Sequence, residues 1–177
     1  MHRLFVALHL PATLRQHLLA GMGGGVGLRW QSDAQLHLTL RFIGEVDRHQ
    51  AEDIAVALGR VRAMPFEIAL TGAGTFGGGG RPHSLWVGVT PAAPVAELHA
   101  RVDAALARAG VPRDGRAFQP HVTVARMRRT ATGIGEALDR WAGFATAPAA
   151  ITDFRLYESH LGGEGATYET IARYALG

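Results

Sequence analysis

Apolar and polar residues follow two different periods along the chain. Where apolar residues form short runs or alternate with polar ones, we predict strands. These lie at 4–10, 35–44, 66–70, 84–89, 119–127, 151–157 and 168–176. Where apolar residues recur at i, i+3, i+4 and i+7, we predict helices. These lie at 11–20, 45–62, 91–109 and 135–141.

The predicted elements occur twice in the same order. Strand, Pro-initiated helix, loop, strand, helix and strand follow one another from near residue 3 and again from near residue 84. Duplication of one unit is the simplest account, so we expect residues 1–177 to form a single bilobal domain of two similar lobes. The connections are too short for alternating parallel strands throughout. This predicts an α+β fold with largely antiparallel sheets, helices on their outer faces and a cleft between the lobes.

A short polar motif is repeated within the two alternating strands. His37 and Thr39 stand in QLHLTLRFIG, and His121 and Thr123 stand in QPHVTVARM. Side chains two residues apart in a strand share a face, so each copy presents an imidazole beside a hydroxyl. The pseudo-symmetry of the lobes is expected to bring the two copies together across the cleft.

Two arginines follow these motifs. Arg41 shares a face with His37 and Thr39 if its strand runs straight, so it could contact a bound phosphate or serve as a structural arginine. Arg126 would point to the opposite face from His121 unless the strand ends first. Both are candidate substrate-binding residues.

Glycine-rich stretches interrupt the predicted elements. Residues 21–27 read as a slack connection, with a mobile substrate lid as the alternative. Residues 72–80 read as a connection, because a phosphate-binding loop would need a GK[ST] ending and a following helix. Residues 162–165 read as a turn.

Composition narrows the class of protein. The chain is 47% apolar, which favours a folded domain, and it has no cysteine, which excludes disulfides, thiolate nucleophiles and cysteine-ligated zinc. All 18 basic residues are arginine, a pattern compatible with phosphate or RNA binding and also with GC-rich codon usage. No apolar stretch has the length of a membrane span or the form of a signal peptide, so we expect a soluble cytoplasmic protein.

The paired motifs indicate phosphodiester chemistry. Near pH 7 one imidazole can accept a proton while the other donates one, because the ordinary pKa of histidine is about 6.5. Threonine hydroxyls can donate to non-bridging phosphate oxygens. A 2′,3′-cyclic phosphate suits this arrangement, since its strained ring supplies the leaving oxygen and reduces the need for a metal.

Nearly the whole chain resembles the 2H phosphoesterases, and among them the RNA 2′,3′-cyclic phosphodiesterases, also called 2′-5′ RNA ligases. The resemblance rests on RLFVALHLP, LHLTLRFIGEV, FQPHVTVAR and FRLYESHL with Tyr168 beyond it. His9 departs from a common acidic residue and Val124 from a usual leucine. The resemblance implies metal-independent hydrolysis to a 2′-phosphomonoester, and reversible 2′-5′ ligation is attributed to some members.

By the same resemblance, His37 donates a proton to the leaving oxygen, His121 activates water, and Thr39 and Thr123 hold the phosphate. The substrate would be RNA or a nucleotide with a 2′,3′-cyclic phosphate, with no cofactor, no metal and no obligate protein partner. The residues alone leave open which histidine is the acid.

Two other classes remain as alternatives. A metal hydrolase would need three convergent ligands, and neither motif contains a carboxylate at ligand spacing. A non-catalytic RNA-binding module would keep its RNA affinity without either histidine. Trp30 and Phe118 could stack on a base, although aromatic residues beside strands are more often part of the core.

Overall fold

The computed structural model describes residues 1–78, 80–163 and 165–177. Its strands are β1 (His2–His9), β2 (Leu28–Trp30), β3 (His37–Val46), β4 (Phe66–Gly78), β5 (Arg81–Thr90), β6 (His121–Met127), β7 (Ala149–Ile151), β8 (Asp153–Gly162) and β9 (Gly165–Ala175). Its helices are α1 (Ala12–Gly21), α2 (Arg48–Leu58), α3 (Ala93–Arg108) and α4 (Ile134–Ala142), with a 3-10 turn η1 (Asp33–Gln35).

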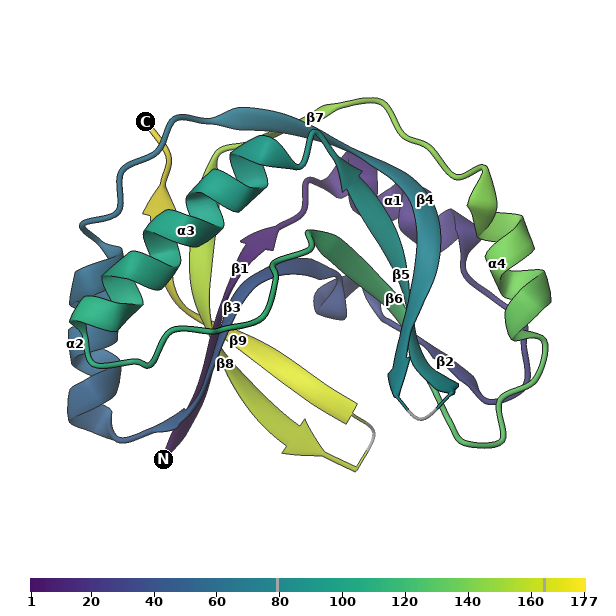
Figure 1. Cartoon of the computed structure of the whole chain (residues 1–177), viewed down its shortest axis with the longest axis horizontal. Helices are drawn as coiled ribbons and strands as arrows, with labels where there is room; N and C mark the ends of the chain where they lie inside the picture. Colours follow the sequence, from purple (N-terminus) through teal and green to yellow (C-terminus); the bar gives the residue numbers. More distant parts are fainter. Residues whose placement is uncertain (79, 164) are drawn as a thin grey trace.

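The strands form one continuous antiparallel sheet, which confirms the predicted α+β class. The strand order is β7-β4-β5-β6-β3-β1-β8-β9, and β2 adds to the free end of β6. The two motif strands are neighbours at the centre, where Leu38 pairs with Val122. We call β1, β3, β8 and β9 the first arm and β2, β4, β5, β6 and β7 the second arm; together they form an arch (Figure 1).

The helices cover the outer faces of the arch, as predicted. α2 and α3 pack together on the first arm, and α1 and α4 lie on the second (Figure 1). Gly21 at the end of α1 lies against the ring of Trp141 in α4, where an added Cβ would come within 3.0 Å of it. Each arm therefore combines elements from both ends of the chain. The proposed repeat from residues 3 and 84 stays a prediction.

Local sequence explains where the helices begin. The side chain of Asp47 accepts a hydrogen bond of 2.8 Å from the Gln50 backbone N–H and so caps α2. Pro94 stands in the first turn of α3, where its missing N–H costs nothing. The prediction of a helix over 45–62 was too long, because Glu45 and Val46 complete strand β3.

The prediction of a connection over 72–80 was wrong for 72–78, which belong to β4; residue 79 lies outside the described residues. At two of these glycines the neighbouring residues leave no room for a side chain. A Cβ on Gly74 would overlap the Trp86 ring, and one on Gly77 would overlap the Arg81 carbonyl oxygen. The predicted turn at 162–165 joins β8 to β9 and includes residue 164, also outside the described residues.

The glycine-rich connection 21–27 is held against the second arm. Trp30 Nε1 donates to the Gly24 carbonyl at 2.9 Å, and the Arg140 guanidinium donates to the Gly23 carbonyl at 3.0 Å. None of residues 21–27 lines the cleft described below. This geometry fits a connection better than a substrate lid.

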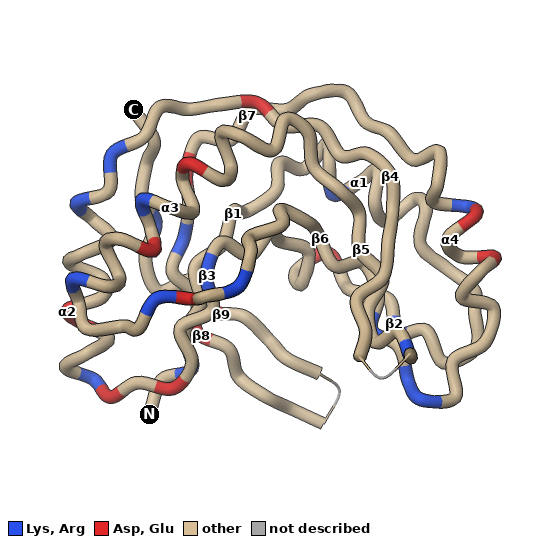
Figure 2. The backbone as a smooth tube through the Cα atoms, viewed as in Figure 1, with Lys and Arg blue, Asp and Glu red and all other residues tan. Residues whose placement is uncertain are grey.

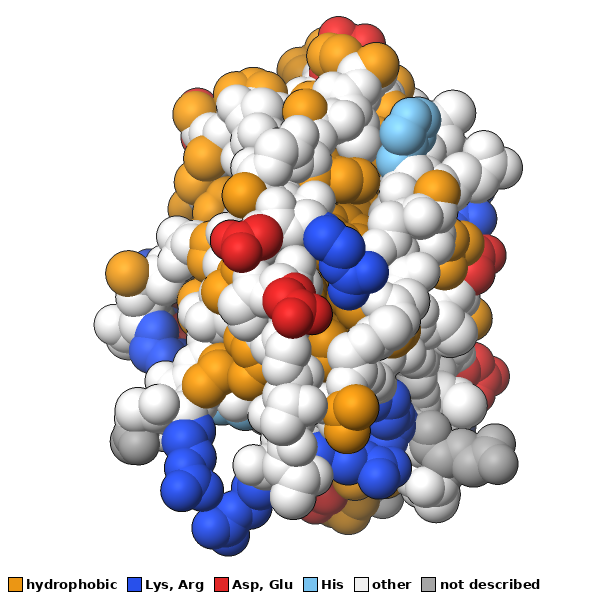
Figure 3. All heavy atoms as spheres, turned by 90° about the vertical axis from the view of Figure 1, so that its right-hand side faces the viewer, with side chains coloured by type: hydrophobic (Ala, Val, Ile, Leu, Met, Phe, Trp, Pro, Cys, Tyr) orange, Lys and Arg blue, Asp and Glu red, His pale blue; other side chains and the backbone are white. Residues whose placement is uncertain are grey.

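Charged residues are spread over both arms. Blue and red alternate along the loop between α3 and β6, and arginines gather near the lower edge of the outer face of the second arm (Figures 2 and 3). Among the described residues, no helix has the length and apolarity needed to cross a bilayer.

Candidate active site

The two motif strands share the same pattern of burial over seven residues. In each, the histidine and threonine are partly exposed, the residues between and after them are buried, and the sixth residue is exposed. The pattern breaks from simple alternation because each strand carries a β-bulge after its threonine. Leu40 and Val124 are the extra residues, as the register of the neighbouring strands shows.

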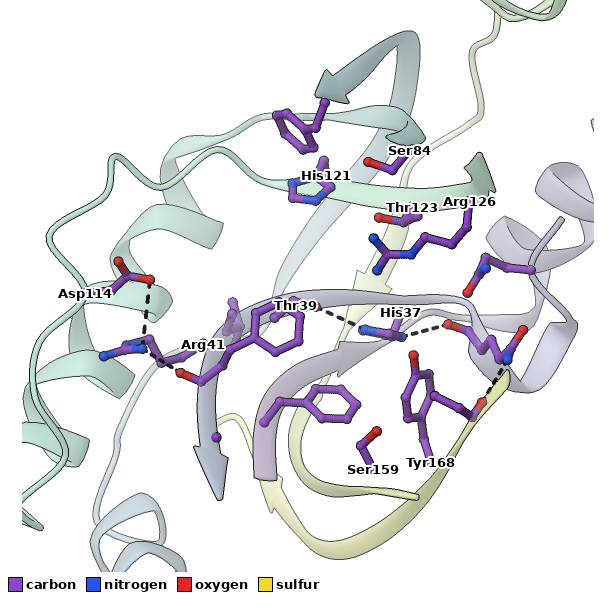
Figure 4. Close-up of a pocket in the computed structure, with 18 of the residues that line it drawn as sticks. His37, Thr39, Arg41, Ser84, Asp114, His121, Thr123, Arg126, Ser159 and Tyr168 are labelled. Atoms are coloured by element: carbon purple, nitrogen blue, oxygen red, sulfur yellow. Dashed lines mark hydrogen bonds and ion pairs between the residues drawn. The ribbon is translucent and has the colours of Figure 1, made fainter. Parts of the chain in front are cut away.

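The structure brings the two histidines and two threonines together on the inner face of the arch. Because Leu38 pairs with Val122, His37 lies across from Thr123, and Thr39 lies across from His121. Diagonal neighbours on antiparallel strands are about 7–8 Å apart, so the imidazoles can flank one phosphate. Figure 4 shows all four side chains facing the same cleft.

Both imidazoles are oriented by the same hydrogen bond. Nδ1 of His37 donates to the Gln35 carbonyl at 2.7 Å, and Nδ1 of His121 donates to the Gln119 carbonyl at 2.7 Å. With the proton on Nδ1, each Nε2 carries no proton, and that of His37 accepts a hydrogen bond from the Thr39 hydroxyl at 3.0 Å. We did not identify these glutamines as positioning residues from sequence, although each stands two residues before its histidine.

The pKa values of both imidazoles are lowered. Burial lowers the pKa of His37 to about 4, opposed by its hydrogen bond to Gln35 and assisted by the charge of Arg126. Burial also lowers the pKa of His121, opposed by its hydrogen bond to Gln119 and assisted by Arg126. Without a bound anion, both imidazoles are therefore neutral near pH 7.

Aromatic rings bury each imidazole. His37 lies 5.1 Å from the ring centres of both Phe5 and Tyr168. His121 lies 4.7 Å from the ring centre of Phe76 and 6.2 Å from that of Trp86. These contacts fix the rings and supply the desolvation that lowers their pKa values.

Arg41 does not share the face of His37, because the bulge at Leu40 turns it toward the helices. Its Nε donates to Asp103 of α3 at 2.9 Å, and its other nitrogens donate to the carbonyls of Phe42 and Pro112. The side chain is 9% exposed, although it borders one end of the cleft. These bonds connect the first motif strand to the loop that leads to His121.

Arg126 lies on the face of His121, contrary to the prediction from simple alternation. The bulge at Val124 shifts the register by one residue and returns Arg126 to the cleft. Its charge acts on both imidazoles. Figure 4 shows its guanidinium between the two motif strands.

The cleft has a volume of about 820 Å³ and a basic lining. Among the described residues, its lining includes a single carboxylate, Asp114, which accepts two hydrogen bonds from the Arg116 side chain. Hydrogen bonding to Arg116 holds the pKa of Asp114 well below its usual range. Five arginines border the same space: Arg3, Arg29, Arg41, Arg116 and Arg126. Such a lining favours an anionic ligand.

One exposed aromatic residue in the cleft was missed from sequence. Phe42 occupies in β3 the position that Arg126 occupies in β6, and it is 55% exposed. Its ring lies 5.9 Å from that of Phe5. Of the aromatic candidates named from sequence, Phe118 lines the cleft stacked on His99, whereas Trp30 stacks on Trp141 beside the core.

Among the described residues, one group could hold a metal: Glu158, His160 and Glu169, whose ligand atoms lie within 4.8 Å of one another. These residues alternate with Ser159 and Tyr168 along β8 and β9, so they lie on the opposite face from the cleft. His160 pairs with Glu169 at 3.2 Å. The group is therefore separate from the histidine pair.

Comparison with known proteins gives a consistent result. A family model described as the 2′-5′ RNA ligase superfamily matches residues 27–163. The chain is 30% identical over 172 residues to a protein named RNA 2′,3′-cyclic phosphodiesterase from Archaeoglobus fulgidus, covering 96% of this chain and 97% of that protein. A protein of the same name from Escherichia coli is 30% identical over 179 residues, covering 98% and 96%.

Solved structures agree with the sequence matches. E. coli LigT in complex with 3′-AMP has a TM-score of 0.80 and 28% identity, covering 99% of this chain and 98% of that one. A Thermus thermophilus protein, TT0787, has a TM-score of 0.80 and 26% identity, covering 98% and 97%. This chain belongs to the 2′-5′ RNA ligase superfamily.

Proposed function

We propose that this protein hydrolyses 2′,3′-cyclic phosphates at RNA or nucleotide ends to 2′-phosphomonoesters. The observation that carries the proposal is the pairing of the two motif strands, which puts two imidazoles and two hydroxyls around one basic cleft. The names of the curated relatives support the same reaction, and a solved neighbour holds 3′-AMP.

In the proposed reaction His121 accepts a proton from water as the water oxygen attacks phosphorus. The bond from phosphorus to the 3′ oxygen breaks, and His37 donates a proton to that oxygen. The products are a 2′-phosphate and a free 3′ hydroxyl. The role of each histidine follows the family resemblance, and the pseudo-symmetry of the two arms would equally permit the reverse assignment.

The lowered pKa values of the two imidazoles fit this scheme only if the bound substrate raises the pKa of the proton donor. His37 is neutral in the free protein, and the negative charge of a bound phosphodiester raises the pKa of an adjacent imidazole. Substrate binding would thus favour the protonated form of His37, which can then act as the proton donor.

Thr39, Thr123 and Arg126 are the residues that we assign to the phosphate. Arg126 lies in the cleft beside both histidines, and both threonines line it. Arg41 fits this role less well, because its guanidinium is occupied by Asp103 and two backbone carbonyls. The sequence-based prediction that Arg41 binds phosphate is untested. We propose instead that Arg41 has a structural role.

A 2′-5′ ligation would use the same site. If the 5′ hydroxyl of a second RNA replaces water as the nucleophile, the same proton transfers join the two ends through a 2′-5′ phosphodiester. The chain would act in the cytoplasm, where its lack of cysteine is compatible with a reducing environment.

Turnover of cytidine 2′,3′-cyclic phosphate in EDTA tests the proposal. We expect metal-independent formation of the 2′-phosphate, identified by phosphorus NMR. Strict dependence on a divalent metal would support a metal hydrolase, and exclusive formation of the 3′-phosphate would exclude the proposed direction of cleavage. RNA binding that survives loss of both histidines, without any turnover in the unmodified protein, would support a binding module.

A further inference from the structure

Ser84 is a largely buried serine at the wall of the cleft, and the proposed reaction does not yet use its hydroxyl. It lies in β5, is 1% exposed and borders the cleft. Its Oγ has no hydrogen-bond partner within the described parts of the chain. The Oγ is not among the fully buried polar atoms that lack a partner in the described residues, so the small exposed part of Ser84 includes its hydroxyl, which is open to a ligand atom in the cleft.

The register of the second arm places Ser84 beside the phosphate-binding residues. Ser84 pairs with Arg126, and the adjacent residue pair on the same face joins Trp86 to Thr123. Paired residues on antiparallel strands have Cβ atoms about 5 Å apart, within reach of one phosphate group. Figure 4 shows Ser84, His121, Thr123 and Arg126 on the same side of the cleft.

The equivalent pair in the first arm has no hydrogen-bond donor. There the bulge brings Phe42 opposite Phe5, at the positions that Arg126 and Ser84 occupy in the second arm. In addition, the Thr39 hydroxyl is already bonded to His37 Nε2 at 3.0 Å. At these equivalent positions beside the histidines, the donors therefore lie on the second arm.

We propose that Ser84 is a further substrate-binding residue, whose Oγ–H donates to a non-bridging oxygen of the phosphate together with Thr123 and Arg126. The proposal rests on the function proposed above and names the oxygen-binding side of that site. Because Ser84, Thr123 and Arg126 all lie on the second arm, they bind one non-bridging oxygen more strongly than the other. The site therefore distinguishes the two oxygens.

Sulfur substitution gives a readout that a merely structural serine would not change. Each diastereomer of uridine 2′,3′-cyclic phosphorothioate carries sulfur in place of a different non-bridging oxygen. Sulfur accepts hydrogen bonds more weakly than oxygen, so the protein should prefer one diastereomer in kcat/KM. We expect Ser84→Ala to reduce that preference about 5-fold or more and to weaken competitive inhibition by inorganic phosphate about 10-fold.

Matched variants separate the hydroxyl from the packing. Ser84→Thr and Ser84→Val have nearly the same shape and differ in the hydroxyl, so only the valine variant should lose the preference and the phosphate affinity. Ser159→Ala removes a serine from the opposite wall, and its phosphate affinity should match that of the unmodified protein. Circular dichroism shows whether each variant is folded.

The outcomes distinguish this proposal from the proposed function. If the unmodified protein turns over the cyclic phosphate but folded Ser84→Ala and Ser84→Val keep both its diastereomer ratio and its phosphate inhibition constant, the role of Ser84 is wrong. If the unmodified protein does not turn over the substrate, the proposed function is wrong. Inorganic phosphate binding then still tests Ser84, and equal affinities across the variants would overturn its role.

Discussion

The two arms of the arch present the same motif in different chemical surroundings. Each orients its histidine through Nδ1 and a glutamine carbonyl at 2.7 Å, and each carries a bulge after its threonine. The first arm then presents Phe42, whereas the second presents Arg126. In the proposed reaction the shared features supply a pair of acid–base groups, and the difference gives the cleft an apolar residue on one arm and a positive charge on the other.

The largest expected effect tests whether the arms act on one phosphate. His37→Ala and His121→Ala should each lower kcat/KM about 10²–10⁴-fold, because each removes a proton transfer from the same displacement. The double variant should lose much less than the product of the two single losses. Steady-state kinetics on the folded variants measures this. Near-normal activity in either single variant would show that the two histidines do not both act on one phosphate.

The residue after each bulge differs between the arms, and this difference should show in stability. Arg41 forms a buried ion pair with Asp103, whereas the equivalent residue in β6 is the buried Ala125. Arg41→Met leaves Asp103 with only the exposed Arg113, 3.8 Å away, and should lower the free energy of unfolding by about 3 kcal/mol. Urea denaturation measures this change.

Arg48→Met provides a matched control for the Arg41 variant. Arg48 and Glu52 lie 2.9 Å apart, like Arg41 and Asp103, but both are exposed. Losing this pair should cost less than about 1 kcal/mol. Equal losses in the free energy of unfolding for the two substitutions would show that burial does not increase the contribution of the Arg41–Asp103 pair to stability.

Sequence reasoning located the motif strands and the helices, because these depend on local periodicity. It also predicted that the motifs meet, since the order of elements repeats. For straight strands it expected Arg41 on the face of His37 and Arg126 on the face opposite His121, and the bulges change both. A bulge is set by the register against the neighbouring strand, and alternation along one strand cannot reveal it.

Other features of the site depend on contacts between distant segments. Gly74 pairs with Trp86 of β5, whose ring lies over it, and this pairing between strands is not visible in the glycine-rich composition of the stretch. The isolation of the Ser84 hydroxyl likewise becomes visible only when β5 is placed against β6. The shared spacing from histidine to Phe42 and to Arg126 was the one available signal in the sequence for these two cleft residues.

Arg126 is the charge that most distinguishes the second arm, and its removal should change both rate and pH dependence. Arg126→Gln should lower kcat/KM about 10²-fold by removing a charged donor from the phosphate. The positive charge lowers the pKa of both His37 and His121, so its loss should raise both. The bell-shaped profile of kcat/KM should therefore move to higher pH.

Arg126→Lys serves as the control, since it keeps the positive charge near both imidazoles. Its pH profile should stay close to that of the unmodified protein even if its rate falls. If Arg126→Gln did not change the pH profile of kcat/KM, the charge of Arg126 would not be setting the pKa values of His37 and His121.

The threonines should show the smallest effects and the same asymmetry. Thr39 already bonds His37, whereas Thr123 has no side-chain partner within the described residues. Thr123→Val should therefore lower kcat/KM about 10-fold, and Thr39→Val should lower it less, because each removes one neutral donor from the phosphate. A larger loss in Thr39→Val than in Thr123→Val would place the phosphate on the first arm.

The most direct test of a single shared site is to titrate the histidines by NMR with and without inorganic phosphate. In the free protein we expect His37 to titrate near pH 4 and His121 below its ordinary pKa. Phosphate bound between the two imidazoles should raise the pKa of both His37 and His121. The NMR signals of the exposed His17 and His49, which do not line the cleft, should not respond to phosphate. A shift in only one of the two, or in neither while phosphate binds, would contradict a site shared by both arms.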